Sequence, residues 1–367
     1  MANITKKGER KYRVRISKQS QGVRRFVNYT IRGTLKDARE FARQQETLLD
    51  SGELDRSGLT FAAYFRLWLA AIKPKIAPRT FDGYEGSIRR YALDRLAAMQ
   101  LEAIRLEHVQ TIYLEIGKSP TTVRNLHAAL RACFNYARRR GFIRSNPCDN
   151  ADLPAKSRRP IRVLSFEEAR RFVAACGQTP NGLVFEFALE TGMRPEEYLA
   201  LRWSDISGSE ASVQQVVQYR RSGGGFYFDK PKTAKSRRRV PLSDALRRSL
   251  ARHRTAQLEH RIAMRGTWFD RDLVFPNEVG HPQPLNNLSR RYLRPALAAA
   301  GLAERGITLY SLRHTCATLL LMSGENPKVV ADRLGHSSVT LTLDTYSHVL
   351  PHIQADATET LNRLMRG

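Results

Sequence analysis

The 367-residue sequence lacks the long apolar run that a membrane span needs, and it contains few cysteines. No stretch of about 18 consecutive apolar residues occurs, so we expect no membrane-spanning segment. Residues 1–10 have no apolar core of the kind that a secretory signal needs, so we expect no secretory signal there. The four cysteines form no C-x-x-C pair, so we expect reduced thiols rather than a disulfide framework or a metal site.

Acidic residues are also scarce relative to basic ones, with 35 Asp and Glu against 61 Lys and Arg, a formal net charge of +26. Such an excess indicates an anionic partner, and double-stranded DNA is favoured because neutralising its phosphates releases counterions. An anionic membrane surface would instead call for one amphipathic basic helix, whereas basic residues here follow the whole chain. At 42% hydrophobic residues the chain can bury cores, which excludes a wholly disordered protein.

The start of the chain, residues 1–56, is predicted to be a small DNA-binding module. Residues 1–36 contain eleven Lys and Arg against one acidic residue. Strict alternation over Lys11–Ile16 predicts a half-buried strand with one basic face, followed by a second strand over 23–31 and a helix capped by Thr34. We expect this sheet to contact DNA, although a merely solvated face is the alternative. The expected contacts are Arg13, Arg15, Arg24 and Arg25.

Residues 59–150 are predicted to form an all-helical domain, with helices near 61–69, 79–91, 106–116 and 120–140. The last helix carries Arg124 and Arg131 on a polar stripe that fits either a DNA backbone or an ordinary exposed face. Residues 151–161 are a linker by composition. Its basic residues suggest a clamp that closes around a duplex. They are Lys156, Arg158 and Arg159.

Residues 162–367 are predicted to form a third, mostly helical domain with a small antiparallel sheet, so the fold class is mixed and mainly α. Strands over 213–219 and 226–228 flank the glycine-rich turn 222–225, a hairpin pattern. Four segments carry candidate catalytic residues in a fixed order. They are Thr191–Asp205 with Arg194, Phe228–Leu242 with Lys232, Thr308–Thr315 with Arg313, and Leu334–Val349 with His336 and Tyr346.

In this order, the four segments resemble the tyrosine recombinase (phage integrase) family. The helical middle domain resembles the core-binding domain of that family, and the basic N-terminal module resembles its arm-binding domain. The resemblance implies that Arg194, Lys232, Arg313 and His336 are catalytic and that Tyr346 is the nucleophile. Tyr310 is the one departure, because it lies where the family usually has a histidine.

The chemistry of these side chains agrees with the resemblance. Two arginines can clamp the non-bridging oxygens of a phosphodiester with donors that stay charged. A tyrosine phenolate can attack phosphorus and store the bond as a phosphotyrosine, so rejoining needs no ATP. Lys232 can protonate the leaving oxygen, and His336 can bind the phosphate or help to deprotonate Tyr346. Glu197 is interpreted as an orienting residue and His314 as a packing residue. Tyr310 is interpreted either as a catalytic residue that donates a hydrogen bond to a phosphate oxygen or as a packing residue.

The resemblance implies a site-specific recombinase of a mobile element, acting on core and arm sites of double-stranded DNA through a 3′-phosphotyrosine and a Holliday junction. We expect a homotetramer with neither a metal nor another cofactor, located in the cytoplasm with the nucleoid of a bacterial host. A DNA-bending host factor and a directionality factor are open as further partners. A monomeric type IB topoisomerase and an architectural DNA-binding protein with a decayed site are the alternatives, and Tyr310 is the hint for the second.

Overall fold

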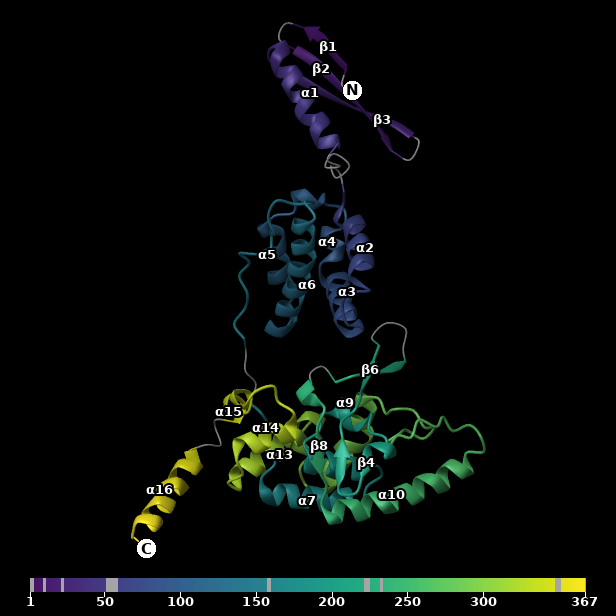
Figure 1. Cartoon of the computed structure of the whole chain (residues 1–367), viewed down its shortest axis with the longest axis vertical. Helices are drawn as coiled ribbons and strands as arrows, with labels where there is room; N and C mark the ends of the chain where they lie inside the picture. Colours follow the sequence, from purple (N-terminus) through teal and green to yellow (C-terminus); the bar gives the residue numbers. More distant parts are fainter. Residues whose placement is uncertain are drawn as a thin grey trace. The chain divides into compact units, whose positions relative to one another are not determined.

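A computed structural model of the chain (Figure 1) is mostly helical with small antiparallel sheets, as the sequence predicts. It divides into two compact units, residues 1–158 and residues 159–367. Among the residues that it describes, no helix combines the length and apolar character needed to cross a membrane. The described residues are 3–8, 11–20, 23–50, 59–156, 160–220, 225–231, 234–346 and 351–366.

The N-terminal sheet is a three-stranded antiparallel meander followed by one helix. Strands β1 (Asn3–Gly8), β2 (Lys11–Ser20) and β3 (Val23–Arg32) are adjacent in that order, and α1 spans Leu35–Asp50. The alternation of β2 buries Val14 against the helix and leaves Arg13 and Arg15 exposed. Strand β1 is not predicted from the sequence, because its polar residues show no alternating pattern.

The middle of the chain forms a helical core lined with aromatic side chains. Its helices are α2 (Phe61–Ile72), α3 (Pro78–Tyr91), α4 (Leu93–Leu96), α5 (Leu106–Glu115) and α6 (Pro120–Arg139), with a 3₁₀ turn over Leu101–Ala103. The caps follow the sequence: Thr60 accepts a hydrogen bond from the amide of Ala63, and Ser119 accepts one from that of Thr122. The buried hydroxyl of Tyr64 donates to the carbonyl of Cys133 at 2.9 Å, which ties α2 to α6.

The second unit is a helical domain with two small sheets. The helices before its strands are α7 (Phe166–Cys176), α8 (Leu183–Thr191) and α9 (Pro195–Tyr198). The strands are β4 (Ile206–Ser207), β5 (Glu210–Ser212), β6 (Val216–Tyr219), β7 (Phe226–Asp229) and β8 (Arg239–Pro241). The helices after the strands are α10 (Asp244–Ala263), α11 (Leu285–Asn287), the π-helical turn η5 (Leu288–Leu293), α12 (Arg294–Ala299), α13 (Leu309–Met322), α14 (Pro327–Leu334), α15 (Val339–Tyr346) and α16 (Pro351–Arg366). Short 3₁₀ turns cover Trp203–Asp205, Ala234–Ser236 and Ala303–Arg305.

The two sheets of this unit divide the strand that the sequence predicts over residues 213–219. Strands β4, β5 and β8 form one sheet, and β6 pairs with β7 in the predicted hairpin, whose residues 221–224 lie outside the described part. Strand β6 starts only at Val216, because the amide of Val213 instead donates to the carbonyl of Arg238 at 2.9 Å, next to β8. The chain therefore passes from one sheet to the other between these residues.

A close approach of helices at Gly192 brings segments with candidate catalytic residues together. Gly192 ends α8 with φ 64°, a left-handed conformation that suits glycine. A Cβ atom there would lie 2.8 Å from Leu334 Cδ2 and 3.1 Å from Cys316 Sγ. Glycine therefore lets the end of α8 pack against α13 and α14, and the chain turns directly into Arg194.

Candidate active site

Arg194 is held in place by the acidic residue one helical turn after it. It is the N-cap of α9, and its amide donates to Glu197 Oε2 at 2.9 Å. Its Nη1 donates to Glu197 Oε1 at 2.7 Å, while a third of the side chain stays exposed. The carboxylate thus fixes one edge of the guanidinium and leaves other donors available to a ligand.

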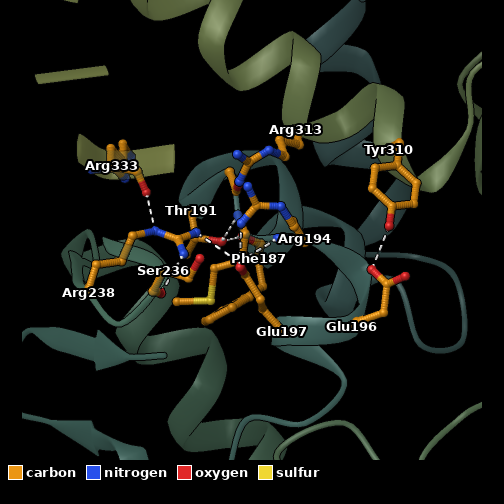
Figure 2. Close-up of polar contacts among 12 residues, drawn as sticks. Phe187, Thr191, Arg194, Glu196, Glu197, Ser236, Arg238, Tyr310, Arg313 and Arg333 are labelled. Carbon is orange, nitrogen blue, oxygen red and sulfur yellow. Dashed lines mark hydrogen bonds and ion pairs between the residues drawn. The ribbon is translucent and has the colours of Figure 1, made fainter. Parts of the chain in front are cut away.

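Glu197 is buried between two arginines (Figure 2). Besides Arg194, it accepts a hydrogen bond from Arg238 Nη2 at 2.9 Å. Burial acts to raise the pKa of Glu197, but Arg238 and then Arg194 outweigh burial and hold the pKa below its ordinary value. The carboxylate is therefore ionised and compensates both cations, which agrees with its interpretation as an orienting residue.

Arg238 connects two of the four segments with the end of α14, and the sequence did not indicate this role. Its side chain is 7% exposed; Nε donates to the carbonyl of Arg333 at 2.5 Å and Nη1 to that of Ser236 at 3.2 Å. Together with its bond to Glu197, these contacts join the segment just before β8 to α9 and to the end of α14. In the sequence it stands among three consecutive arginines, and no local pattern distinguishes it from its neighbours.

Arg313 is buried next to Arg194. It lies on α13 with 4% exposure, and its Nη1 donates to the carbonyl of Gly192 at 2.7 Å. Its buried Nη2 has no hydrogen-bond partner among the described residues. Burial, and after it the charge of Arg194, lowers the pKa of Arg313 to about 10, so it remains a cation at neutral pH. Figure 2 shows the two guanidinium groups side by side.

His336 follows the left-handed Gly335 that ends α14. It is 9% exposed, and its Nδ1 lies 2.7 Å from Thr342 Oγ1. Burial lowers the pKa of His336 to about 4, with further contributions from the charges of Arg313, Arg194 and Arg238. The ring is therefore neutral at physiological pH.

Tyr346 ends α15 and is 1% exposed. Its hydroxyl lies 2.8 Å from Nδ1 of His314, which was predicted only to be a packing residue. Burial raises the pKa of Tyr346 to about 12, against the charge of Arg313, so the phenol is protonated at neutral pH. No signal in the sequence could have paired His314 with Tyr346, because 32 residues separate them.

Tyr310, the departure from the family pattern, contacts an acidic side chain. Its ring is 43% exposed in the first turn of α13, and its hydroxyl donates to Glu196 Oε2 at 2.6 Å (Figure 2). Lys232 lies outside the described residues. Three residues further along the chain, Lys235 Nζ donates to the carbonyl of Ser337 at 2.8 Å. The 3₁₀ turn between β7 and β8 therefore contacts the segment of His336.

The structure describes the side chains of only some of the residues expected to bind DNA. Arg13, Arg15 and Lys156 are exposed, whereas Arg158, Arg159 and the side chains of Arg24 and Arg25 lie outside the described part. Two arginines of α6 contact their own unit: Arg124 Nε donates to the carbonyl of Pro154 at 3.0 Å, and Arg131 Nε lies 3.4 Å from Asp149 Oδ1. These contacts give both arginines of α6 a structural role.

Within the same described ranges, no group of three or more His, Cys, Asp and Glu side chains is arranged to hold a metal ion. The site is instead a cluster of cations. Three guanidinium groups and one ionised carboxylate leave an excess of positive charge around Arg313. Such a cluster is suited to hold an anionic group that offers several oxygen acceptors.

Comparison with known proteins identifies the family. The phage integrase family model matches residues 162–352, and the model of the phage integrase N-terminal SAM-like domain matches residues 60–116. A tyrosine recombinase XerC-like protein of Caldanaerobacter subterraneus is 29% identical, over 99% of this chain and 98% of the relative. The ICEBs1 integrase of Bacillus subtilis is 25% identical, over 91% and 92% of the two chains.

Solved structures show the same fold. The Tn1549 transposon integrase in complex with circular intermediate DNA gives a TM-score of 0.66 at 22% identity, over 83% of this chain and 100% of the other. A lambda integrase tetramer bound to a Holliday junction gives 0.58 at 18% identity, over 90% and 91%. The chain belongs to the phage integrase family, the tyrosine recombinases, which cleave and rejoin DNA. The predicted family and the predicted site-specific recombination are confirmed.

Proposed function

We propose that the chain is the integrase of a mobile genetic element. It cuts and rejoins double-stranded DNA at attachment sites through a 3′-phosphotyrosine and a Holliday junction, as a homotetramer. Among its relatives is the ICEBs1 integrase, and the similar solved structures include a transposon integrase on DNA and a lambda integrase tetramer on a Holliday junction. These likenesses support both the mobile element and the tetramer.

The Nη2 of Arg313, which has no hydrogen-bond partner among the described residues, is the observation that carries the proposed site. A buried donor without an acceptor is costly, and the cost is greater for a charged group. A phosphodiester placed against Arg313 and Arg194 would supply the missing acceptor and part of the missing negative charge. Donors fixed before the substrate arrives stabilise the charge that develops on the non-bridging oxygens in the transition state.

The other side chains take roles around that phosphate. Tyr346 attacks phosphorus and Lys232 protonates the leaving 5′ oxygen. His336, whose Nδ1 is engaged by Thr342, donates from Nε2 to a phosphate oxygen as a neutral ring. Tyr310 holds Glu196, next to Glu197, through its hydroxyl.

The domain assignments and the DNA contacts complete the proposal. Residues 1–56 bind arm-type sites, 59–150 and the linker 151–161 bind the core site, and 162–367 perform the chemistry. Their positive charge supports DNA contacts by the residues predicted from the sequence, and the protein acts with the nucleoid in the cytoplasm of its host. A DNA-bending host factor and a directionality factor are further partners. The proposed contacts are Arg13, Arg15, Arg24, Arg25, Arg124, Arg131, Lys156, Arg158 and Arg159.

A covalent protein–DNA adduct tests this function. The protein is incubated with the DNA that flanks its own gene, and complexes that survive SDS are digested with nuclease and analysed by mass spectrometry. We expect a 3′-phosphonucleotide on Tyr346, none in Tyr346→Phe, and an unchanged yield in the control Tyr292→Phe, whose hydroxyl only reaches Glu278 at 3.4 Å. An adduct on another tyrosine, or an active Tyr346→Phe, would overturn the assignment. Sequence-independent relaxation of supercoiled plasmid would indicate a topoisomerase instead.

A further inference from the structure

Helix α13 supplies neighbours for both the phosphate and the nucleophile. Successive residues of an α-helix point about 100° apart, so Arg313 and His314 face different surroundings. Arg313 turns to Gly192 and Arg194, whereas His314 turns to α15, where its Nδ1 lies 2.8 Å from the Tyr346 hydroxyl. The two rings are tilted at 57° with centroids 5.8 Å apart, so the contact runs through the ring nitrogen rather than through stacking.

The protonation states indicate which of the two groups donates. Burial, and then the charge of Arg313, holds the pKa of His314 below its usual value, so the ring is neutral and has one nitrogen lone pair. Burial raises the pKa of Tyr346 to about 12, so the hydroxyl keeps its proton at neutral pH. In the Nε2–H tautomer of this neutral ring, Nδ1 carries the lone pair and accepts the hydrogen bond from the phenol. His336 is less suited to this role, because its Nδ1 is engaged by Thr342.

We propose that His314 is a catalytic residue, the general base that accepts the phenolic proton of Tyr346. The inference rests on the proposed function, in which Tyr346 is the nucleophile. During cleavage the proton moves from Tyr346 Oη to His314 Nδ1, Oη bonds to phosphorus, and the bond from phosphorus to the 5′ oxygen breaks. Lys232 donates a proton to that oxygen. Rejoining runs in reverse, and His314 returns its proton to Tyr346, so protons and electron pairs balance over the cycle.

The charges around His314 couple this proton transfer to DNA binding. The charged and titratable groups near His314 are Arg313 on its own helix, Tyr346 on α15 and His336 beyond α14, while Cys316 lies near Tyr346. In the free protein, nearby cations disfavour an imidazolium at His314. A bound phosphodiester brings negative charge to the same cluster and makes the imidazolium easier to form. The tyrosine is therefore activated when DNA occupies the site and stays protonated when the site is empty.

Single-turnover cleavage of two matched DNA substrates tests the role. Both carry the core site recovered from the trapped adduct, and one has a sulfur atom in place of the leaving 5′ oxygen. A thiolate leaves without protonation, because thiol pKa values are about 8.5. Loss of a general acid is therefore rescued by sulfur, whereas loss of the base is not. Lys232→Ala should cleave the sulfur substrate far better than the oxygen substrate.

His314→Asn should be slower by about 10²–10⁴ on both substrates, the usual contribution of a general base. The asparagine carbonyl can accept the phenol's hydrogen bond but cannot take up its proton. His127→Asn is the matched control, because His127 Nδ1 makes a similar contact of 3.1 Å with the Tyr113 hydroxyl in the helical domain. We expect the control to cleave at the wild-type rate.

The pH profile separates a base from a packing residue. On the sulfur substrate, with DNA saturating, the wild-type rate should fall toward acidic pH as His314 becomes protonated. His314→Asn should lack this acid limb. A wild-type profile without the limb would overturn the inference without any variant, even if His314→Asn failed to fold. An unaltered limb in His314→Asn would assign His314 a packing role, and an active Tyr346→Phe would refute the proposed function instead.

Discussion

At the scale of single residues, the site depends on one carboxylate that serves two arginines. Glu197 is 1% exposed at its side chain and meets Arg194 at 2.7 Å and Arg238 at 2.9 Å. Taking any of these charges out of water is costly, so the arrangement is stable only as a set. Glu197 thus both orients Arg194 and holds Arg238, next to β8, in place.

Glu197→Gln should destabilise the protein by about 3–5 kcal/mol, because it leaves Arg238 buried without its counter-charge. Urea unfolding measures the change. Glu210→Gln is the matched control on β5, since its contact with Arg239 is 3.8 Å long and exposed, and it should cost no more than about 1 kcal/mol. Equal losses in the two variants would contradict the bridging role of Glu197.

The same carboxylate predicts how stability depends on pH. The folded-state pKa of Glu197 lies below its ordinary value, so its stabilising contribution is complete above the unfolded value of about 4.3. That contribution is lost as the pH falls through the folded pKa. Unfolding free energies measured from neutral to acidic pH should therefore fall less steeply in Glu197→Gln than in the wild type. Parallel curves would show that Glu197 is not the group that titrates.

Tyr310→Phe should keep DNA binding and slow cleavage by no more than about tenfold, because it removes one hydrogen bond to Glu196 and no charge. Single-turnover cleavage and a binding titration measure the two effects. Tyr310→His, which restores the usual residue of the family, is the companion variant and should remain active. A loss of a thousandfold in Tyr310→Phe would instead place the phenol against the reacting phosphate.

At the scale of elements, turns hold the catalytic segments together more than strands do. Gly192 lets the end of α8 meet α13, and its carbonyl accepts the hydrogen bond from Arg313 at 2.7 Å. Gly335 does the same for the segment of His336: a Cβ there would lie 2.9 Å from Arg238 Nη1. Both glycines end helices with positive φ, at 64° and 68°.

Gly192→Ala should therefore destabilise the protein more than Gly208→Ala. Both residues have positive φ, 64° and 57°, so both variants incur backbone strain of about 1–2 kcal/mol. Only Gly192 has close neighbours for a new Cβ, while Gly208 has nothing within 4 Å. Thermal unfolding measures the difference, and the loss of cleavage should accompany Gly192→Ala alone. An equal loss of thermal stability in both variants would mean that the close neighbours of Gly192 add nothing to the destabilisation.

The sequence predicts local features of this fold better than its long-range contacts. Residues near each other in the chain define the caps, as in Ser165, which accepts from the Glu168 amide at 3.2 Å. The strands β4, β5 and β8 have two or three residues each, too few to show an alternating pattern. Within the site, the contact of Arg238 with Glu197 spans 41 residues, so it depends on packing that local patterns do not encode.

At the scale of the whole molecule, the charge of +26 is distributed over parts with different proposed tasks. Exposed Arg13 and Arg15 lie on one face of β2, opposite the face that buries Val14. A sheet with one basic face can follow a phosphate backbone while its other face packs on α1. The catalytic cluster, in contrast, uses buried arginines. Arm-site binding and cleavage should therefore be separable by mutation.

Replacing Arg13 and Arg15 together by alanine should weaken binding to arm-site DNA and leave cleavage of an isolated core site unchanged. Each lost phosphate contact lowers the salt dependence of binding by about 0.9 in log–log slope, so the pair should lower it by about 2. Lys36→Ala with Arg39→Ala, two exposed positions on α1, removes the same charge from the helix and is the control. If both double variants lost slope equally, the module would attract DNA by its net charge. A larger loss for the strand pair would identify the basic face of β2 as the surface that contacts the arm site.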